Sequence, residues 1–211
     1  MKVLIYTCNI CNYDTRKEVH QSGNFLYLSD DISPIKGWKI QKIDISLPDV
    51  RQARYWKINS HLLDSEYTIW VDASFHIDGP IQELVEGVKG MACYPHGTVW
   101  LSNKTAYEEA EVCKEAGLDD PRIINKQVAR YRKEGFPDKP LFSTGILVRK
   151  NTPEIKKFNE AWWDEVKRGS HRDQISQTYA AWKTGVEIER IEEGDVYKNN
   201  YVTKTKHVKY Q

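Results

Sequence analysis

Two hydrophobic patterns alternate along the chain. Runs rich in β-branched and aromatic residues are interleaved with segments in which apolar residues recur every three or four positions. The first pattern is typical of strands and the second of amphipathic helices, so their alternation indicates an α/β layer fold. The strand-like runs cover 2–7, 38–45, 67–74, 91–94, 142–150 and 186–191. We therefore predict a central mixed six-stranded sheet flanked by helices.

The helical segments carry start signals as well as periodicity. Thr152 and Pro153 offer an N-cap and a first-turn proline, and the apolar residues after them share one stripe. The other helices are expected at 51–62, 80–88, 105–116, around 124–131 and from about Ser170 onward. Because no repeat or linker interrupts this order, we expect residues 1–211 to form a single domain.

Composition narrows the possible partners. The 211 residues include 31 Lys and Arg against 30 Asp and Glu, which gives a net charge of +1. Such a balance gives no bulk attraction to nucleic acid or to an anionic membrane. No apolar run has the length of a membrane span, and the N-terminus leads directly into strand-like sequence. We expect a cytoplasmic protein with neither a nucleic-acid partner nor a membrane span.

The cysteines favour reduced thiols. There are four in a chain that is large enough to fold without disulfides. Cys8 and Cys11 form a C-x-x-C, for which a redox pair or half of a zinc site is the less favoured alternative. A zinc site would need a second pair of ligands with similar spacing, and the sequence has none.

The most informative segment is YTIWVDASFHIDGP at 67–80. An apolar strand ends at Asp72, and ligands of open α/β sheets bind at the carboxyl ends of the strands. A divalent cation that bridges a diphosphate requires hard oxygen ligands at this edge. Asp72 is therefore a candidate metal ligand, the alternative being a carboxylate in an ordinary turn.

Three motifs together resemble a known family. They are RYWKINSH at 54–61, YTIWVDASFHI at 67–77 and RDQ at 172–174. They resemble the hexosyltransferase-like proteins of plants and bacteria that were long described as a domain of unknown function. They are most similar to glycosyltransferase domains that chlorella viruses use in capsid-glycan synthesis, which would place the protein in a host cytoplasm. The similarity extends from YT at 6–7 and YD at 13–14 to the RDQ triplet.

The resemblance implies a GT-A fold, a UDP-sugar donor and Mn²⁺ (or Mg²⁺). In GT-A enzymes a D-x-D motif ends a central strand, and a histidine near the C-terminus often completes the metal shell. The matching positions are Asp72, Ala73 and Ser74, so the second aspartate is missing. This departure gives more weight to His207, because a neutral imidazole is a suitable ligand for Mn²⁺. The expected metal ligands are Asp72, Ser74 and His207.

Two acids are candidates for work at the anomeric carbon, Asp78 and Asp173. If configuration is retained, as the resemblance suggests, the acid acts as nucleophile or stabilises an oxocarbenium-like state; if it is inverted, the acid is a general base. Each acid also has a structural interpretation. Asp78 precedes Gly79 and Pro80 as a helix N-cap would, and Asp173 fits a capping box that starts at Ser170.

The remaining candidates would contact the nucleotide sugar. Tyr6, Thr7 and Tyr13 lie at the end of the first strand and suit a uracil pocket, although Tyr6 can also be a core residue. Arg54 and Lys57 lie three apart and can face a diphosphate, or form a solvated helix face. The full set of expected contacts is Tyr6, Thr7, Tyr13, Arg54, Lys57, Asp72, Ala73, Ser74, Ser143, Gly145, Arg172 and Gln174.

The function that these features predict is transfer of a hexose or deoxyhexose, glucose- or rhamnose-like, from a UDP-sugar to a hydroxyl of a glycan or glycoprotein acceptor, with retention. The alternative is a non-catalytic module that binds a nucleotide or sugar. A D-x-D-x-T phosphatase would need an aspartate in place of Ser74. The polar tail from residue 194 onward reads as solvated, although its tyrosines would allow it to pack.

Overall fold

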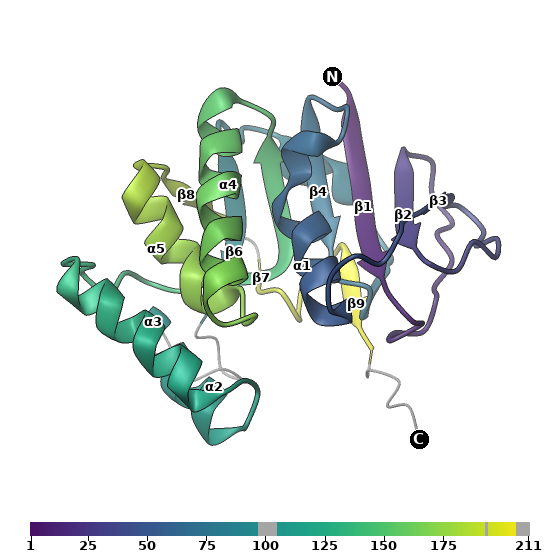
Figure 1. Cartoon of the computed structure of the whole chain (residues 1–211). Helices are drawn as coiled ribbons and strands as arrows, with labels where there is room; N and C mark the ends of the chain where they lie inside the picture. The colour runs from purple at the N-terminus through teal and green to yellow at the C-terminus, as the bar shows by residue number, and fades with distance from the viewer. Residues whose placement is uncertain (97–104, 193, 206–211) are drawn as a thin grey trace.

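The central sheet has seven strands in the order β3-β2-β1-β4-β7-β6-β8 (Figure 1). The computed structural model describes residues 1–96, 105–192 and 194–205. The strands of the sheet are β1 (Val3–Asn9), β2 (Phe25–Ser29), β3 (Lys39–Lys42), β4 (Tyr67–Val71), β6 (Met91–Pro95), β7 (Phe142–Lys150) and β8 (Ile188–Arg190). β7 runs antiparallel to its neighbours β4 and β6, whereas the other pairings are parallel. The predicted mixed sheet with flanking helices is confirmed.

The predicted number of strands was wrong because β2 was missed. All five residues of this strand, FLYLS, are buried. A strand that is covered on both faces shows no alternation of polar and apolar positions, so its pattern is only a short apolar run. The edge strands are also shorter than expected, with β3 and β8 covering only part of 38–45 and 186–191.

The helices form mainly where their start signals are strongest. They are α1 (Asp49–Ile58), α2 (Ala106–Glu115), α3 (Pro121–Lys133), α4 (Pro153–Arg168) and α5 (Gln174–Thr184). Thr152 caps α4 as predicted, because its hydroxyl accepts from the Ile155 amide. The segment expected at 51–62 ends its α-helix at Ile58 and continues as a 3₁₀ turn, η1 (Ser60–Leu62), whereas the segment at 80–88 forms only the 3₁₀ turn η2 (Ile81–Val85).

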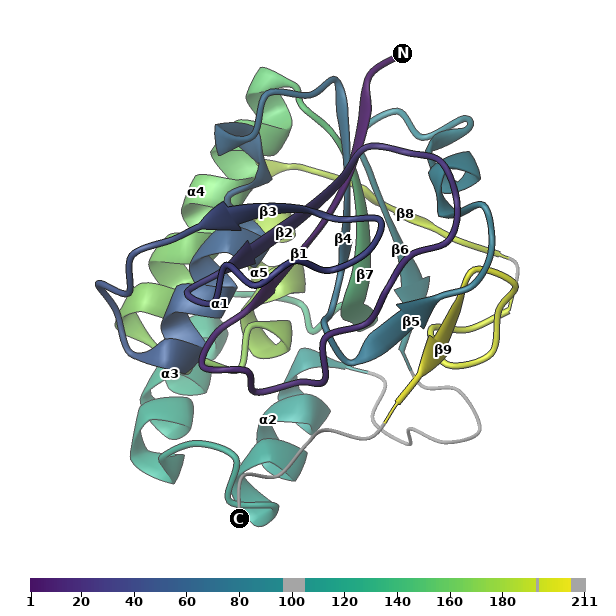
Figure 2. The same ribbon diagram turned by 90° about the vertical axis from the view of Figure 1, so that its right-hand side faces the viewer.

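The sheet separates two hydrophobic layers. Helices α1, α4 and α5 cover one face, while η2 and a small two-stranded sheet lie on the other (Figure 2). The α4 stripe of Phe158, Trp162 and Val166 is fully buried in the first layer. Helices α2 and α3 pack against α5 around a third cluster. The expected helical periodicity therefore faces the core in each case where a long helix forms.

The described part of the C-terminal tail is partly buried and pairs with a strand, which corrects the expectation of a wholly solvated terminus. Strand β9 (Val202–Lys204) pairs antiparallel with β5 (Phe75–Ile77). The Thr205 amide donates to the Ser74 carbonyl at 2.8 Å, next to the end of β4. Gly79 allows this approach, because a Cβ at that position would lie 2.1 Å from the Asn200 carbonyl oxygen. The tail thus lies against the edge of the sheet that carries Asp72.

Within the described ranges, we find no helix with both the length and the apolar character that crossing a bilayer requires.

Candidate functional site

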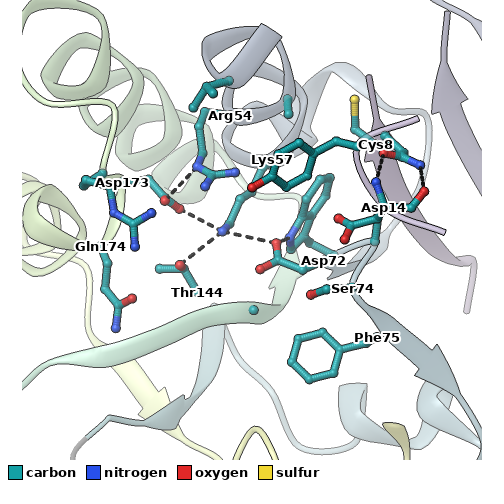
Figure 3. A pocket seen from close by; sticks show the side chains of 18 of the residues that line it. Cys8, Asp14, Arg54, Lys57, Asp72, Ser74, Phe75, Thr144, Asp173 and Gln174 are labelled. Atoms are coloured by element: carbon teal, nitrogen blue, oxygen red, sulfur yellow. Dashed lines mark hydrogen bonds and ion pairs between the residues drawn. The ribbon is translucent and has the colours of Figure 1, made fainter. Parts of the chain in front are cut away.

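A cavity of about 560 Å³ opens at the carboxyl ends of β1 and β4, between α1 and the start of α5 (Figure 3). This is the edge of an open α/β sheet at which ligands bind. Most of the residues that the sequence singled out line it together. They are Tyr13, Arg54, Lys57, Asp72, Ala73, Ser74, Ser143, Gly145, Arg172, Asp173 and Gln174.

Lys57 lies at the centre of the site, 1% exposed. Its ammonium is 2.9 Å from Asp173 Oδ2 and 3.3 Å from Asp72 Oδ1, and it donates to the Thr144 hydroxyl at 3.1 Å (Figure 3). An ammonium has three donors, and these three acceptors occupy them. Lys57 therefore holds the two acids of the site rather than offering a free charge to a diphosphate.

Asp173 is buried between two cations. Its second oxygen, Oδ1, lies 2.9 Å from Arg54 Nε. Burial alone would raise the pKa of the Asp173 carboxyl, but Lys57 and Arg54 outweigh that effect and hold the pKa well below its usual range. Its side chain makes no capping bond to α5, so the capping-box alternative is wrong. Asp173 is an ionised group that orients both cations.

Asp72 follows directly after β4 and is about one-third exposed. Trp70, two residues earlier on the same side of the strand, donates from Nε1 to Asp72 Oδ1 at 2.7 Å. Both Trp70 and Lys57 thus contact the same oxygen. Ser74, which stands where a second aspartate was expected, is buried at 2% exposure and also lines the cavity.

A buried arginine fixes the helix that carries Arg54 and Lys57. Arg149, on β7, is fully buried and donates to the carbonyls of Lys57 and Ile58 at 2.7 and 2.8 Å. Its guanidinium also donates to the Tyr6 hydroxyl at 2.8 Å. A cation at the C-terminus of α1 complements both its last carbonyls and its dipole. Sequence reasoning missed Arg149, because a charged residue inside a strand is expected to point to solvent.

The loop that delivers Arg172 and Asp173 is anchored from outside the cavity. Asp119 Oδ2 accepts from the Ser170 hydroxyl at 2.6 Å and from the His171 amide at 2.9 Å. It also lies 2.9 Å from His171 Nδ1. Burial alone would raise the pKa of Asp119, but the bonds from Ser170 and from backbone amides outweigh it and lower the pKa.

The C-x-x-C segment shapes the other end of the cavity. Residues 10–13 form a turn, because the Tyr13 amide donates to the Ile10 carbonyl and both Cys11 and Asn12 have positive φ. The turn leaves Tyr13 half-exposed at the cavity. Cys8 is a buried thiol whose pKa burial raises far above its usual value, and Cys11 is exposed. This arrangement is unlike that of a reactive thiol pair.

Other predicted site residues lie apart from the cavity. Tyr6 is fully buried, and its hydroxyl donates to the Lys57 carbonyl at 3.0 Å, so its side chain belongs to the core. Thr7 is buried beside a much smaller hollow. Asp78 pairs with His76 at 2.6 Å outside the cavity lining, and η2 is not capped by it. His207 lies outside the described residues.

The sequence contained signals for some residues that were missed. Trp70 precedes Asp72 by one strand repeat, so its indole had to lie on the same side. Thr144 sits between the predicted Ser143 and Gly145. In contrast, Tyr197 and Lys204 reach the cavity lining only because the tail pairs with β5, which no local pattern indicates.

The described residues offer a divalent cation the Asp72 carboxylate rather than a complete cage. No group of three His, Cys, Asp or Glu side chains among them is arranged to hold a metal. Mg²⁺ and similar ions are commonly held by one or two carboxylates together with substrate phosphates. The oxygen donors of Asp72 and Ser74 fit an ion of that kind, and a bound diphosphate would supply the remaining ligands.

Comparison with known proteins identifies the family. The model of the TOD1/MUCI70 glycosyltransferase-like domain matches residues 7–207. The chain belongs to the TOD1/MUCI70 glycosyltransferase-like family. A search of curated proteins finds no match. Membership in TOD1/MUCI70 confirms the predicted similarity to a glycosyltransferase-like family, whereas the closer similarity to viral capsid-glycan enzymes and the host-cytoplasm location stay predictions.

A solved glycosyltransferase structure shares the GT-A-like fold of this TOD1/MUCI70 member. The bifunctional glycosyltransferase WbbM aligns over 90% of this chain and 38% of its own, with 10% identity and a TM-score of 0.50. The apo form of GlyE from Streptococcus pneumoniae TIGR4 aligns over 91% of this chain and 45% of its own, with 13% identity and a TM-score of 0.48. The TOD1/MUCI70 chain thus spans less than half the length of either structure. At 10% identity the similarity to WbbM concerns the fold alone.

Proposed function

We propose that this protein transfers a hexose or deoxyhexose from a UDP-sugar to a hydroxyl of a glycan or glycoprotein acceptor. One observation carries the proposal: Asp72 ends a central strand in a cavity that also contains Arg54, Lys57 and Arg172, in a chain of a glycosyltransferase-like family. A cavity of about 560 Å³ has the size of a small-molecule site, for which roughly 300–1,000 Å³ is usual.

The turn after β1 is the proposed nucleotide end. The Asn9 side chain bonds both the amide and the carbonyl of Asp14, at 3.0 and 2.8 Å, which fixes the loop that carries Tyr13. The half-exposed Tyr13 ring offers a face on which a base can stack. Asp14 is 8% exposed and lines the same end, where its carboxylate can accept from a base N–H.

The diphosphate would lie between Asp72 and the two arginines. Arg54 contacts Asp173 through Nε, so its terminal N–H groups can face phosphate oxygens. Asp72, with Ser74 beside it, would hold Mn²⁺ or Mg²⁺. Such an ion supplies Lewis-acid stabilisation of the departing UDP.

Asp173 is the proposed acid near the transferred sugar. It stays ionised and lines the cavity, so its charge can stabilise the positive charge that develops at the anomeric carbon during retaining transfer. Because both of its oxygens are paired, we assign it an electrostatic role. Asp78 receives no role, since it does not line the cavity.

Release of UDP from UDP-glucose and UDP-rhamnose, with Mn²⁺ or with EDTA, tests this function. We expect turnover with one donor in Mn²⁺ and a loss of about 100-fold or more in kcat/KM for Asp72→Asn, as when a charge-stabilising group is removed. Asp64→Asn is the matched control, because that side chain is 99% exposed, pairs with Lys2 and does not line the cavity. Binding of UDP without turnover of any donor, with or without an acceptor, would instead indicate a non-catalytic module.

A further inference from the structure

Both contacts that hold the Asp72 carboxylate go to one of its two oxygens. Trp70 Nε1 donates to Oδ1 at 2.7 Å, and Lys57 Nζ lies 3.3 Å from the same atom. No hydrogen bond or ion pair from the described residues goes to the other oxygen, Oδ2. The side chain is 32% exposed and lines the cavity, so Oδ2 is the oxygen that faces a ligand.

Packing locks the indole that makes this bond. Trp70 is 1% exposed within the helix-covered layer of the core. Its ring lies edge-on to Tyr6, with centroids 5.2 Å apart, and the Lys57 ammonium is 5.9 Å from its centroid. A phenyl or leucyl side chain could also fill a strand position in this core. What tryptophan adds is one N–H donor, which is aimed at Asp72.

The absence of a second aspartate at position 74 makes the orientation of Asp72 more important. With Ser74 in place of a second aspartate, the cavity edge offers one acid rather than two at the end of β4. A single carboxylate that could rotate would offer an ion two interchangeable oxygens at variable positions. Holding Oδ1 between an indole N–H and an ammonium removes that freedom and leaves Oδ2 at one place.

We propose that Trp70 is a positioning residue that orients Asp72 as a one-oxygen ligand for the donor's divalent cation. This inference rests on the proposed function. Groups that hydrogen-bond to metal ligands tune metal affinity by about 10- to 100-fold. Loss of the indole N–H should therefore weaken cation binding, although the indole acts through Asp72 and does not itself contact the cation.

The test is the affinity for Mn²⁺ in the presence of saturating UDP, with free Mn²⁺ followed by electron paramagnetic resonance. We expect Trp70→Phe to raise the Kd for Mn²⁺ about 10-fold. Trp38→Phe is the matched control: its Nε1 also donates to a protein oxygen, the Lys17 carbonyl at 2.9 Å, and it does not line the cavity. The control should bind Mn²⁺ as the wild type does.

A second replacement separates positioning from folding. Substituting Trp70 with a benzothienylalanine keeps the bicyclic shape and replaces the N–H by sulfur, so packing is preserved while the donor is lost. It should show the same weakening as Trp70→Phe at an unchanged Tm. If the benzothienyl protein binds Mn²⁺ like the wild type, Trp70 does not position Asp72.

Failure of the inference can be told apart from failure of the proposed function. If Asp72→Asn weakens Mn²⁺ binding but neither Trp70 replacement does, only the role of Trp70 is lost. If the wild type binds no Mn²⁺ with UDP, or Asp72→Asn binds it unchanged, the metal role of Asp72 is lost and the inference with it.

Discussion

Replacing Lys57 by methionine should expose how the site holds its two acids together. Methionine keeps an unbranched side chain but removes the ammonium that contacts Asp72, Asp173 and Thr144. The contact with Asp173 is buried on both sides, at 1% and 5% exposure, so solvent cannot replace the lost cation. Of its two ion pairs among the described residues, Asp173 would keep the one with Arg54, while Arg172 acts on it electrostatically.

The expected loss of stability is about 3–5 kcal/mol, because breaking a buried ion pair leaves an uncompensated charge. The pKa of Asp173 should rise at the same time. In the wild type this pKa lies below that of the unfolded chain, so its stabilisation is complete above the usual aspartate pKa and disappears as the pH falls through the depressed value. In Lys57→Met the acid-induced loss of stability should be smaller and should be complete at a higher pH, because it spans only the interval between the unchanged pKa of the unfolded chain and the raised pKa of folded Asp173.

Urea unfolding of Lys57→Met, Asp173→Asn and the double variant, at neutral and at mildly acidic pH, measures both effects. Neutralising Asp173 in the Lys57→Met background should restore part of the loss, with a coupling energy of about 1–3 kcal/mol. Additive losses, or a loss below about 1 kcal/mol for Lys57→Met alone, would refute the view that Lys57 is the clamp between the two acids.

Three further substitutions probe what surrounds the site. Arg149→Met should destabilise the fold, since the unpaired Ile58 carbonyl costs about 1–3 kcal/mol while the Lys57 carbonyl keeps its bond from the Tyr6 hydroxyl, and thermal unfolding checks this. Burial raises the pKa of Tyr6 from 10.0 to about 12. The contribution of this group to stability is therefore complete below the tyrosine pKa of the unfolded chain and is lost as the pH rises through about 12. Tyr6→Phe should remove one late-titrating tyrosine from the near-ultraviolet absorbance curve. Gly79→Ala should release the tail and make it protease-sensitive, because the Cβ would meet the Asn200 carbonyl at 2.1 Å, whereas Gly90→Ala, whose nearest atom is 3.6 Å away, should not.

Local chemistry explains which elements could be predicted. The start of α4 was predictable because Thr152 and Pro153 act on their own helix, and β7 was predicted with its observed bounds, Phe142–Lys150. The pairing of the tail was not predictable, because β9 is short and forms only by pairing with β5. The fully buried β2 shows no periodicity that would separate it from other short apolar runs.

The site was predictable as a set of residues but not as a set of contacts. Spacing put Arg54 and Lys57 on one helical face, and the RDQ motif pointed to Asp173. Spacing could not show that Asp173 pairs with both cations, because that depends on how α5 meets α1. Asp78 failed to reach the cavity for a similar reason: β5 turns it toward His76 and the tail.

The charge of the cavity gives a physical reason to expect a cation with the donor. The basic residues that line it are Arg54, Lys57, Arg172 and Lys204, and the acidic ones are Asp14, Asp72 and Asp173. Leaving histidines aside, the lining of the described chain thus has one positive charge in excess. Lys57 and Arg54 are already committed to carboxylates, so a diphosphate, which carries more than one negative charge, would find little unpaired positive charge. A divalent ion on Asp72 would restore the balance at the point where the leaving group's charge builds. Removal of Mn²⁺ should therefore lower the affinity for UDP more than replacement of either Arg54 or Arg172 alone.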